Sequence, residues 1–275
     1  MLEASVPALQ AQDEGATHAD GALLLNAFRI AHPGNAELQA VLLTPARPTE
    51  HDSVPLSTSG FLYVPATYTL LDYLLARPAE LIEGRRVLEL GAGLGLCASV
   101  LQQWHPPAAR LLATDGDCRV IPLLGGNLCA NAGLDGAGHQ VLRWGADRVR
   151  SSGLAAAWDV VVAADAVFHA HRPDERRDTG RAPSHATTTM ISDLLETAAA
   201  LLDTGGHLVL SVEPRDHLGD GLLTASLFAV AAASGLRCVE ARPRRLDGQL
   251  RPEWQTDVYV FQPGVHVACP RALTT

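Results

Sequence analysis

Three glycines alternate with other residues after a short apolar run: Gly91, Gly93 and Gly95. An apolar segment with helical spacing follows them. A buried strand that leads into a glycine-rich turn and then into a helix offers backbone N–H groups to a ligand, because glycine has no side chain to keep the ligand away. The stretch Arg85–Leu96 therefore predicts a site for part of a nucleotide.

The spacing of this turn and the charge beside it indicate which nucleotide fits. The glycines form G-x-G-x-G, and Leu96 stands where a dinucleotide-binding motif would place its last glycine. Glu89 precedes the turn, and its charge would repel a pyrophosphate but attract a cationic ligand. Both observations argue against an oxidoreductase that uses a nicotinamide dinucleotide, which we keep as an alternative.

Polar and aromatic side chains also follow the other predicted strands. Asp115, after the second strand, can accept hydrogen bonds from ribose hydroxyls. Trp144, after the third, can pack on an adenine face or belong to the core. Asp165, after the fourth, either caps the next segment or faces a substrate. We favour the substrate, with Phe168 as an apolar wall.

Strands and helices must alternate along the chain to hold these side chains. Strands are expected at Arg86–Leu90, Arg110–Thr114, Gln140–Arg143, Trp158–Ala164, His207–Val212, Arg237–Arg242 and Thr256–Gln262. Helices are expected at Ala66–Ala76, Leu94–Trp104, Asp117–Asn131, Thr188–Leu202 and Leu222–Ser234. This alternation predicts an α/β fold with a Rossmann-like, mostly parallel sheet and helices on both faces. Such sheets bind ligands at the carboxyl ends of their strands.

The chain divides into four segments by composition. Residues 1–20 are small and polar and are expected to form a mobile tail. Residues 21–59 hold two apolar, β-favouring runs around the turn His32–Asn35 and then a Pro- and Ser-rich loop, which predicts a small N-terminal β hairpin. Residues 60–262 form the main domain, and residues 263–275 form a C-terminal tail.

Bulk composition argues against several classes of function. The formal net charge is -9, whereas a general nucleic-acid binder is basic. The five cysteines form no C-x-x-C pair, and His169 and His171 lack a neighbouring cysteine or carboxylate cluster, so neither a disulfide framework nor a metal site is predicted. The sequence shows no targeting signal and no apolar run that would span a membrane, which favours a cytoplasmic or nuclear protein.

The assembled motifs resemble those of class I S-adenosylmethionine-dependent methyltransferases. They resemble more closely the family-sixteen group of seven-β-strand protein lysine methyltransferases, over residues 60–262. The resemblance is carried by V-L-E-L-G-A-G-L-G-L (87–96), T-D-G-D (114–117), N-L-C-A-N (127–131), L-R-W-G (142–145), A-A-D-A-V-F (163–168, matching D-x-x-Y/F) and L-L-D-T-G-G-H-L-V-L-S (201–211).

This resemblance implies a seven-stranded sheet with strand order 3-2-1-4-5-7-6 and S-adenosylmethionine as cofactor. It implies an enzyme that transfers a methyl group to a lysine side chain of a protein, with calmodulin or a translation factor as candidate substrate. We separately expect the protein to be a monomer. The residues that it assigns to the cofactor are Glu89, Gly91, Gly93, Gly95, Asp115, Trp144 and Ala164. Asp165 and Phe168 are assigned to the acceptor lysine.

The chain departs from the family pattern at three places. Val64 stands where the family often has a tryptophan, Phe168 offers no phenol, and residues 169–189 form a long polar insert. A class I methyltransferase that acts on a small molecule would keep every cofactor residue, so this acceptor stays an alternative. A binding module without catalysis is disfavoured by the intact glycines and aspartates.

Overall fold

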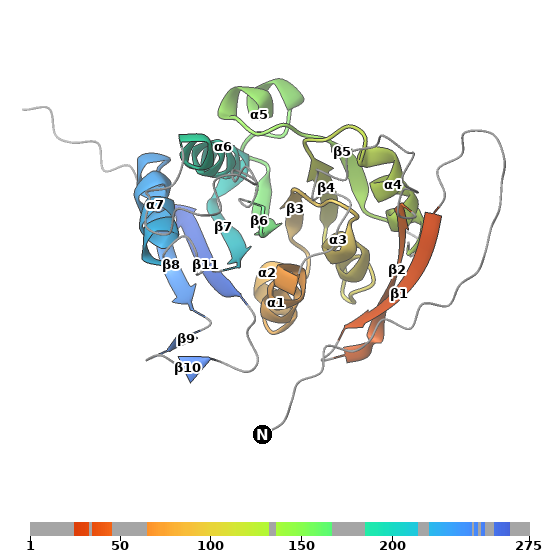
Figure 1. Ribbon diagram of the computed structural model, residues 1–275. Coiled ribbons are helices and arrows are strands. Elements are labelled where there is room, and N and C mark those ends of the chain that lie inside the picture. The colour runs from red at the N-terminus through yellow and green to blue at the C-terminus, as the bar shows by residue number, and fades with distance from the viewer. Residues whose placement is uncertain are drawn as a thin grey trace, which may run out of the picture.

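A mixed seven-stranded sheet forms the centre of the molecule (Figure 1). The computed structural model describes residues 25–32, 35–45, 65–131, 136–166, 185–213, 220–243, 245–246, 249–250 and 256–264. The strands of the central sheet are β3 (Arg86–Leu90), β4 (Arg110–Asp115), β5 (Gly138–Val141), β6 (Trp158–Ala164), β7 (Leu202–Val212), β8 (Leu236–Arg242) and β11 (Asp257–Pro263).

The strands lie in the order β5-β4-β3-β6-β7-β11-β8 across the sheet. Numbered within the sheet, this order is 3-2-1-4-5-7-6, so the predicted fold class and strand order are confirmed. Strands β5, β4, β3, β6 and β7 run parallel, and β11 is antiparallel to both of its neighbours. The carboxyl ends of β3, β4 and β6 therefore meet at one edge of the sheet.

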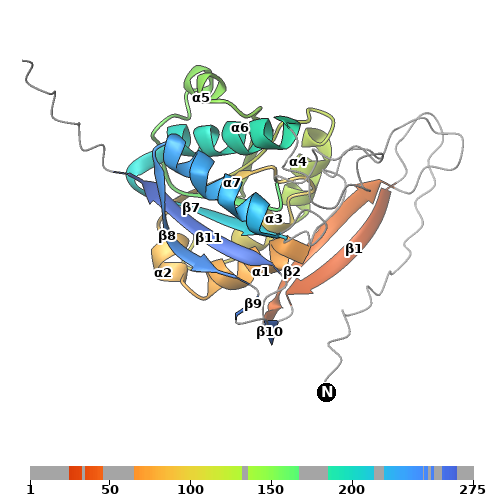
Figure 2. The ribbon, with the colours of Figure 1, turned by 60° about the vertical axis from the view of Figure 1, so that its left-hand side comes forward.

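Helices cover both faces of the sheet (Figure 1 and Figure 2). On one face α5, α6 and α7 bury a cluster that includes Leu88 and Leu194. On the other face α1 to α4 bury a cluster that includes Val87 and Val100. The helices are α1 (Pro65–Leu75), α2 (Pro78–Leu81), α3 (Leu96–Leu101), α4 (Ile121–Ala130), α5 (Ala146–Ser152), α6 (His185–Leu201) and α7 (Asp220–Ala233). None of the helices in the described ranges has the length and apolar character that crossing a bilayer requires.

The central strand β6 shows why its sequence is a continuous apolar run. Val160 and Val162 belong to one buried cluster, whereas Val161 belongs to the cluster on the opposite face. Successive strand side chains point to opposite faces, and helices cover both, so positions 160–163 of this strand are all buried. The predicted bounds of β3 and β6 are those found, because such strands carry a clear sequence signal.

The N-terminal β extension is also confirmed. β1 (Leu25–His32) and β2 (Asn35–Pro45) pair antiparallel, and β2 lies against α3 and α4 (Figure 1). A second small pair, β9 (Arg245–Leu246) and β10 (Gln249–Leu250), was not expected from the sequence.

Two short helices were not predicted, the strand expected from His207 begins at Leu202, and one helix starts later than expected. Helices α2 and α5 each have a single buried residue, Leu81 and Val149, which is too little for a periodic pattern to show. The helix expected from Asp117 begins instead at Ile121. Asp117 Oδ1 accepts the Arg119 backbone N–H at 2.9 Å and so closes a turn ahead of the helix.

Candidate functional site

The glycine turn follows β3 directly, and its backbone requires glycine. Gly91, Gly93 and Gly95 have φ angles of 67°, 52° and 81°, in the left-handed region that side chains disfavour. Gly95 is the N-cap of α3, and a Cβ there would lie 2.4 Å from Leu124 Cδ1. The third glycine is therefore demanded by the packing of α4 against the turn as well as by the turn itself.

The ends of three strands converge on Gly91. A Cβ at Gly91 would lie 3.5 Å from the Cβ of Ala166, just beyond β6, and 3.7 Å from Cζ2 of Trp144, beyond β5. Ala164, assigned to the cofactor, is the last residue of β6 and pairs with Ser211. The fold thus brings together residues that are far apart in the sequence.

The Asp115 carboxylate holds the glycine turn in place. Its Oδ2 accepts the backbone N–H of Gly93 at 3.0 Å, and its Oδ1 accepts that of Asp117 at 2.9 Å. An ionised carboxylate has about four acceptor positions, so these two bonds leave capacity for ribose hydroxyls. The sequence predicted a ribose ligand here and missed the structural contact.

A second support of the turn comes from Asn127 of α4, to which the sequence gave no role. Its side chain is fully buried, and its Nδ2 donates to the backbone carbonyl of Leu94 at 2.9 Å. Asn127 lies within N-L-C-A-N, one of the motifs of the resemblance. That position in a matched motif was the only signal that could have found it.

Glu89 is a buried carboxyl group beneath the first turn of α3. Its side chain is 4 % exposed, and its Oε2 accepts the backbone N–H of Ala98 at 3.2 Å. Burial raises the pKa of Glu89 to about 8; the bond from Ala98 lowers it, and the charge of Asp115 raises it further. Among the described residues, no arginine contributes to the pKa of Glu89. A cation bound nearby would therefore stabilise the ionised form of this carboxyl group.

Trp144 lies half-buried beside the turn and packs against the core cluster of α5 to α7. Its segment is tied to Asp115, since the Leu142 N–H donates to the Asp115 carbonyl at 2.9 Å. The indole is therefore both a neighbour of Gly91 and part of the core edge. The contact with the core confirms one of the two interpretations of Trp144, and the contact with adenine stays a prediction.

Asp165 lies at the carboxyl end of β6 in a strained backbone conformation. Its φ is 46°, which is uncommon for a residue other than glycine, and it is 7 % exposed. Its N–H donates to the Ser211 carbonyl at 2.7 Å, and its Oδ1 accepts the Glu213 N–H at 3.3 Å. Ser211 of β7 thus fixes the backbone of Asp165, and Glu213, just beyond β7, fixes its carboxylate.

Several predicted features lie outside the described residues. These are Phe168, Val64, the H-x-H pair and residues 169–184 of the polar insert. Among the residues that the structure does describe, no group of three His, Cys, Asp or Glu side chains could hold a metal ion.

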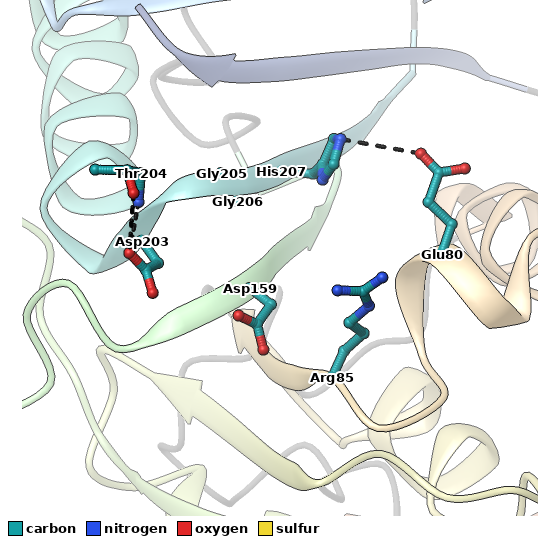
Figure 3. A pocket seen from close by; sticks show the side chains of 8 residues that line it. All are labelled: Glu80, Arg85, Asp159, Asp203, Thr204, Gly205, Gly206 and His207. Atoms are coloured by element: carbon teal, nitrogen blue, oxygen red, sulfur yellow. Dashed lines mark hydrogen bonds and ion pairs between the residues drawn. The ribbon is translucent and has the colours of Figure 1, made fainter. Parts of the chain in front are cut away.

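A hollow of about 240 Å³ lies at the opposite edge of the sheet, at the amino ends of β6 and β7 (Figure 3). It is lined by Glu80, Arg85, Asp159, Asp203, Thr204, Gly205, Gly206 and His207. Arg86 Nη2 lies 2.6 Å from Asp159 Oδ1 and 3.0 Å from Asp203 Oδ2. The hydrogen bonds from Arg86 hold the pKa of Asp159 below its usual range. These paired charges join three strands, and the hollow is remote from the glycine turn.

Comparison with known proteins finds a matching family model and chains of similar fold. Residues 59–174 match the family model described as lysine methyltransferase. TYW2 of M. jannaschii, solved in complex with AdoMet, is 13 % identical, with 90 % of each chain covered and a TM-score of 0.50. A TehB-like SAM-dependent methyltransferase from Corynebacterium glutamicum is 17 % identical, with 73 % of this chain and 89 % of that chain covered and a TM-score of 0.45. No curated protein sequence matches the chain.

The residues at the glycine turn fit S-adenosylmethionine. The buried Glu89 carboxyl lacks a cationic partner among the described residues, and the cofactor carries a sulfonium and an ammonium group. Asp115 keeps acceptor capacity for a ribose, and Trp144 stands beside Gly91. The sheet order and these features identify the chain as an S-adenosylmethionine-dependent methyltransferase with the class I fold, and its residues 59–174 are similar to the family model described as lysine methyltransferase.

Proposed function

We propose that this protein transfers the methyl group of S-adenosylmethionine to the side-chain amine of a lysine in a protein substrate. The observation that carries the proposal is the place of Asp165, a buried carboxylate in a left-handed backbone directly beside Ala166, which faces Gly91. A charged residue in a strained backbone conformation at the end of an apolar strand lowers the stability of the fold. Such residues concentrate at functional sites. The matched family model, described as lysine methyltransferase, supports the same acceptor.

The bound cofactor supplies a methyl group on a good leaving group, so the protein mainly positions the reactants and excludes water. A lysine amine has an ordinary pKa of about 10.4 and must be neutral to attack. Apolar surroundings lower that pKa because they disfavour the cation. The Asp165 carboxylate acts in the opposite direction on the pKa, so we assign it to orienting the amine and accepting its proton. Phe168 would contact the alkyl part of the lysine.

The cofactor side of the site has its own division of roles in this proposal. Asp115 binds the ribose hydroxyls, and Trp144 contacts the adenine. The glycine turn brings the backbone close to the cofactor, and Glu89 balances its positive charge. Calmodulin and translation factors remain candidate substrates in a cytoplasmic or nuclear setting, on the strength of the resemblance alone.

The sequence itself makes the test clear, because it contains 21 arginines and no lysine among its 275 residues. The enzyme therefore has no lysine side chain of its own to methylate. The purified protein is incubated with methyl-labelled cofactor and a proteome from cells that lack it, and labelled sites are mapped by mass spectrometry. We expect label on lysines of another protein and none on side chains of the enzyme. The Asp165→Asn variant serves as the matched control for background labelling.

Other outcomes would contradict the proposal. Label in a small-molecule or RNA fraction, with none in protein, would show a different acceptor on the same cofactor site. Label on histidine or arginine side chains would show that the acceptor group is not an amine of lysine. Because the enzyme cannot label a lysine of its own, label in the enzyme band would itself count against lysine as acceptor.

A further inference from the structure

The segment that carries Trp144 is held at both ends by hydrogen bonds from the core. On one side, the Leu142 N–H donates to the Asp115 carbonyl at 2.9 Å. On the other side, the Gly145 N–H donates to Oγ1 of Thr197 at 2.6 Å. Trp144 lies between these two hydrogen bonds. Its Cζ2 is 3.7 Å from the position that a Cβ at Gly91 would take. The position of the indole therefore depends on both bonds.

Thr197 is suited to this contact by its place in α6. The residue is fully buried, and its hydroxyl donates to the Asp193 carbonyl one turn earlier at 2.6 Å. That bond uses the hydroxyl hydrogen and fixes the rotamer, so a lone pair of the oxygen is free to accept the Gly145 N–H. Valine has the same shape as threonine and can make neither bond.

Gly145 is the point at which the chain turns from Trp144 into α5. Its φ of 124° and ψ of 134° belong to a region that only glycine adopts readily, and it is the N-cap of α5. Its carbonyl accepts the N–H groups of Arg148 and Val149 at 3.0 and 3.2 Å. Among the contacts of the described residues, Thr197 is the partner of its N–H. Loss of the hydroxyl would leave this partly buried N–H without that partner.

We propose that Thr197 is a positioning residue for the adenine side of the cofactor site, which holds Trp144 against the glycine turn through the Gly145 amide. The inference rests on the proposed contact of Trp144 with adenine. Thr197 itself touches neither cofactor nor acceptor in this account. It belongs to α6, which contacts α5, the helix whose N-cap is Gly145.

The test compares Thr197→Val with Thr197→Ser in the full chain. We expect Thr197→Val to weaken binding of adenosine and of S-adenosylmethionine by the same factor of about ten, because an unsatisfied N–H loosens the wall that both ligands contact. The kcat at saturating cofactor should change less than about twofold, since the acceptor side is untouched. Thr197→Ser keeps the hydroxyl and should restore affinity. Ser192→Ala removes another hydroxyl of α6, bonded to Glu196, and should leave affinity unchanged.

Tryptophan fluorescence and hydrogen exchange give readouts that a purely structural role would not move. Adenosine should quench the fluorescence of Trp144 in the unmodified protein and in Thr197→Ser. At saturating adenosine, the quenching should be smaller in Thr197→Val. The Trp144→Phe variant gives the background emission of the other tryptophans. Adenosine should also slow amide hydrogen exchange at Gly145 in the unmodified protein. This measurement does not depend on whether any variant folds.

Two results would overturn the inference in distinguishable ways. If Thr197→Val lowers the thermal midpoint but leaves adenosine affinity within twofold of the unmodified protein, Thr197 only stabilises the fold. If Trp144→Ala also leaves adenosine affinity unchanged, Trp144 itself is not part of the adenine site, and the proposed assignment fails together with the inference. Unchanged exchange at Gly145 on adenosine binding would likewise contradict it.

Discussion

The Glu89 carboxylate accepts a hydrogen bond from the backbone amide of Ala98 at 3.2 Å, which joins β3 to the first turn of α3. The group is buried beside the cofactor turn, and burial raises the pKa of Glu89 from 4.5 to about 8. The folded protein thus holds this proton more tightly than the unfolded chain does. The contribution of Glu89 to the free energy of unfolding is therefore largest below the unfolded pKa, falls as pH rises toward about 8, and is level above it.

Replacement of Glu89 by Gln should remove this part of the pH dependence. Glutamine can still accept the Ala98 N–H but does not titrate. We expect the free energy of unfolding of the cofactor-free protein to fall more steeply between pH 5 and 8 than that of Glu89→Gln, measured by urea denaturation across the range. Equal slopes for the two proteins would show that Glu89 is already ionised in the folded state at pH 5.

Binding of the cofactor should release the proton of the Glu89 carboxyl group. A cation beside Glu89 favours the ionised form, so affinity for S-adenosylmethionine should rise as pH approaches 8, and calorimetry in buffers of different ionisation enthalpy should detect proton release. The α-amino group of the cofactor titrates near pH 8 as well. The comparison with Glu89→Gln separates the two, since the variant keeps only the titration of the cofactor. Identical proton release from both proteins would contradict the coupling.

Asp165→Asn should separate turnover from cofactor binding. Asparagine tolerates the left-handed backbone at φ 46° and can still accept the Glu213 N–H, but it cannot take a proton. We expect turnover to fall by about 100-fold or more, with the cofactor Kd within a few-fold by calorimetry. Asp165→Ala should lose turnover too, and the added backbone strain should lower its stability. Joint loss of turnover and cofactor binding in Asp165→Asn would make the residue part of the cofactor site or of the fold.

Gly206→Ala should destabilise the protein without a specific effect on cofactor binding. A Cβ at Gly206 would lie 2.9 Å from the Trp158 carbonyl oxygen and 3.0 Å from that of Asp159, and backbone atoms cannot move aside cheaply. We expect a loss of about 1–3 kcal/mol in urea denaturation. Gly205 has nothing within 4 Å of its Cβ position, so Gly205→Ala should stay within about 0.5 kcal/mol of the unmodified protein. Similar losses for both variants would show that the close contacts at the Gly206 Cβ position are not the cause.

Arg86→Gln should be less stable than the unmodified protein at neutral pH. This difference in the free energy of unfolding should become smaller in acid. Arg86 donates to both Asp159 and Asp203, and its hydrogen bonds lower the pKa of Asp159 below the usual 3.8. A lowered folded-state pKa contributes stability above the unfolded pKa, and this stability is lost as pH falls through the folded pKa. The difference between the two proteins should therefore narrow as pH drops below about 4. A difference that is constant with pH would indicate lost packing of the arginine side chain.

The glycine turn and the central strands were predictable because their constraints are local. Three alternating glycines predicted a turn after β3, and the structure shows that Gly91, Gly93 and Gly95 form this turn with left-handed backbone. The parallel arrangement then implied that the groups following β3, β4 and β6 share one edge of the sheet, as Gly91 and Ala166 do. Helices α2 and α5 could not be predicted, since each buries only one residue.

The supports of the site were decided by tertiary structure. Thr197 reaches Gly145 across 52 positions of sequence, and Asn127 reaches Leu94 across 33. A hydroxyl or an amide within a helix has the same sequence signature whether it faces a backbone amide or water. The sequence by itself thus determined the turn, the strands and the acids at their ends, because single residues and their spacing set backbone conformation and hydrophobic pattern. Only the packing of α4 and α6 against the sheet decided which distant polar groups hold that turn and Trp144, because hydrogen-bond partners are chosen by position in space.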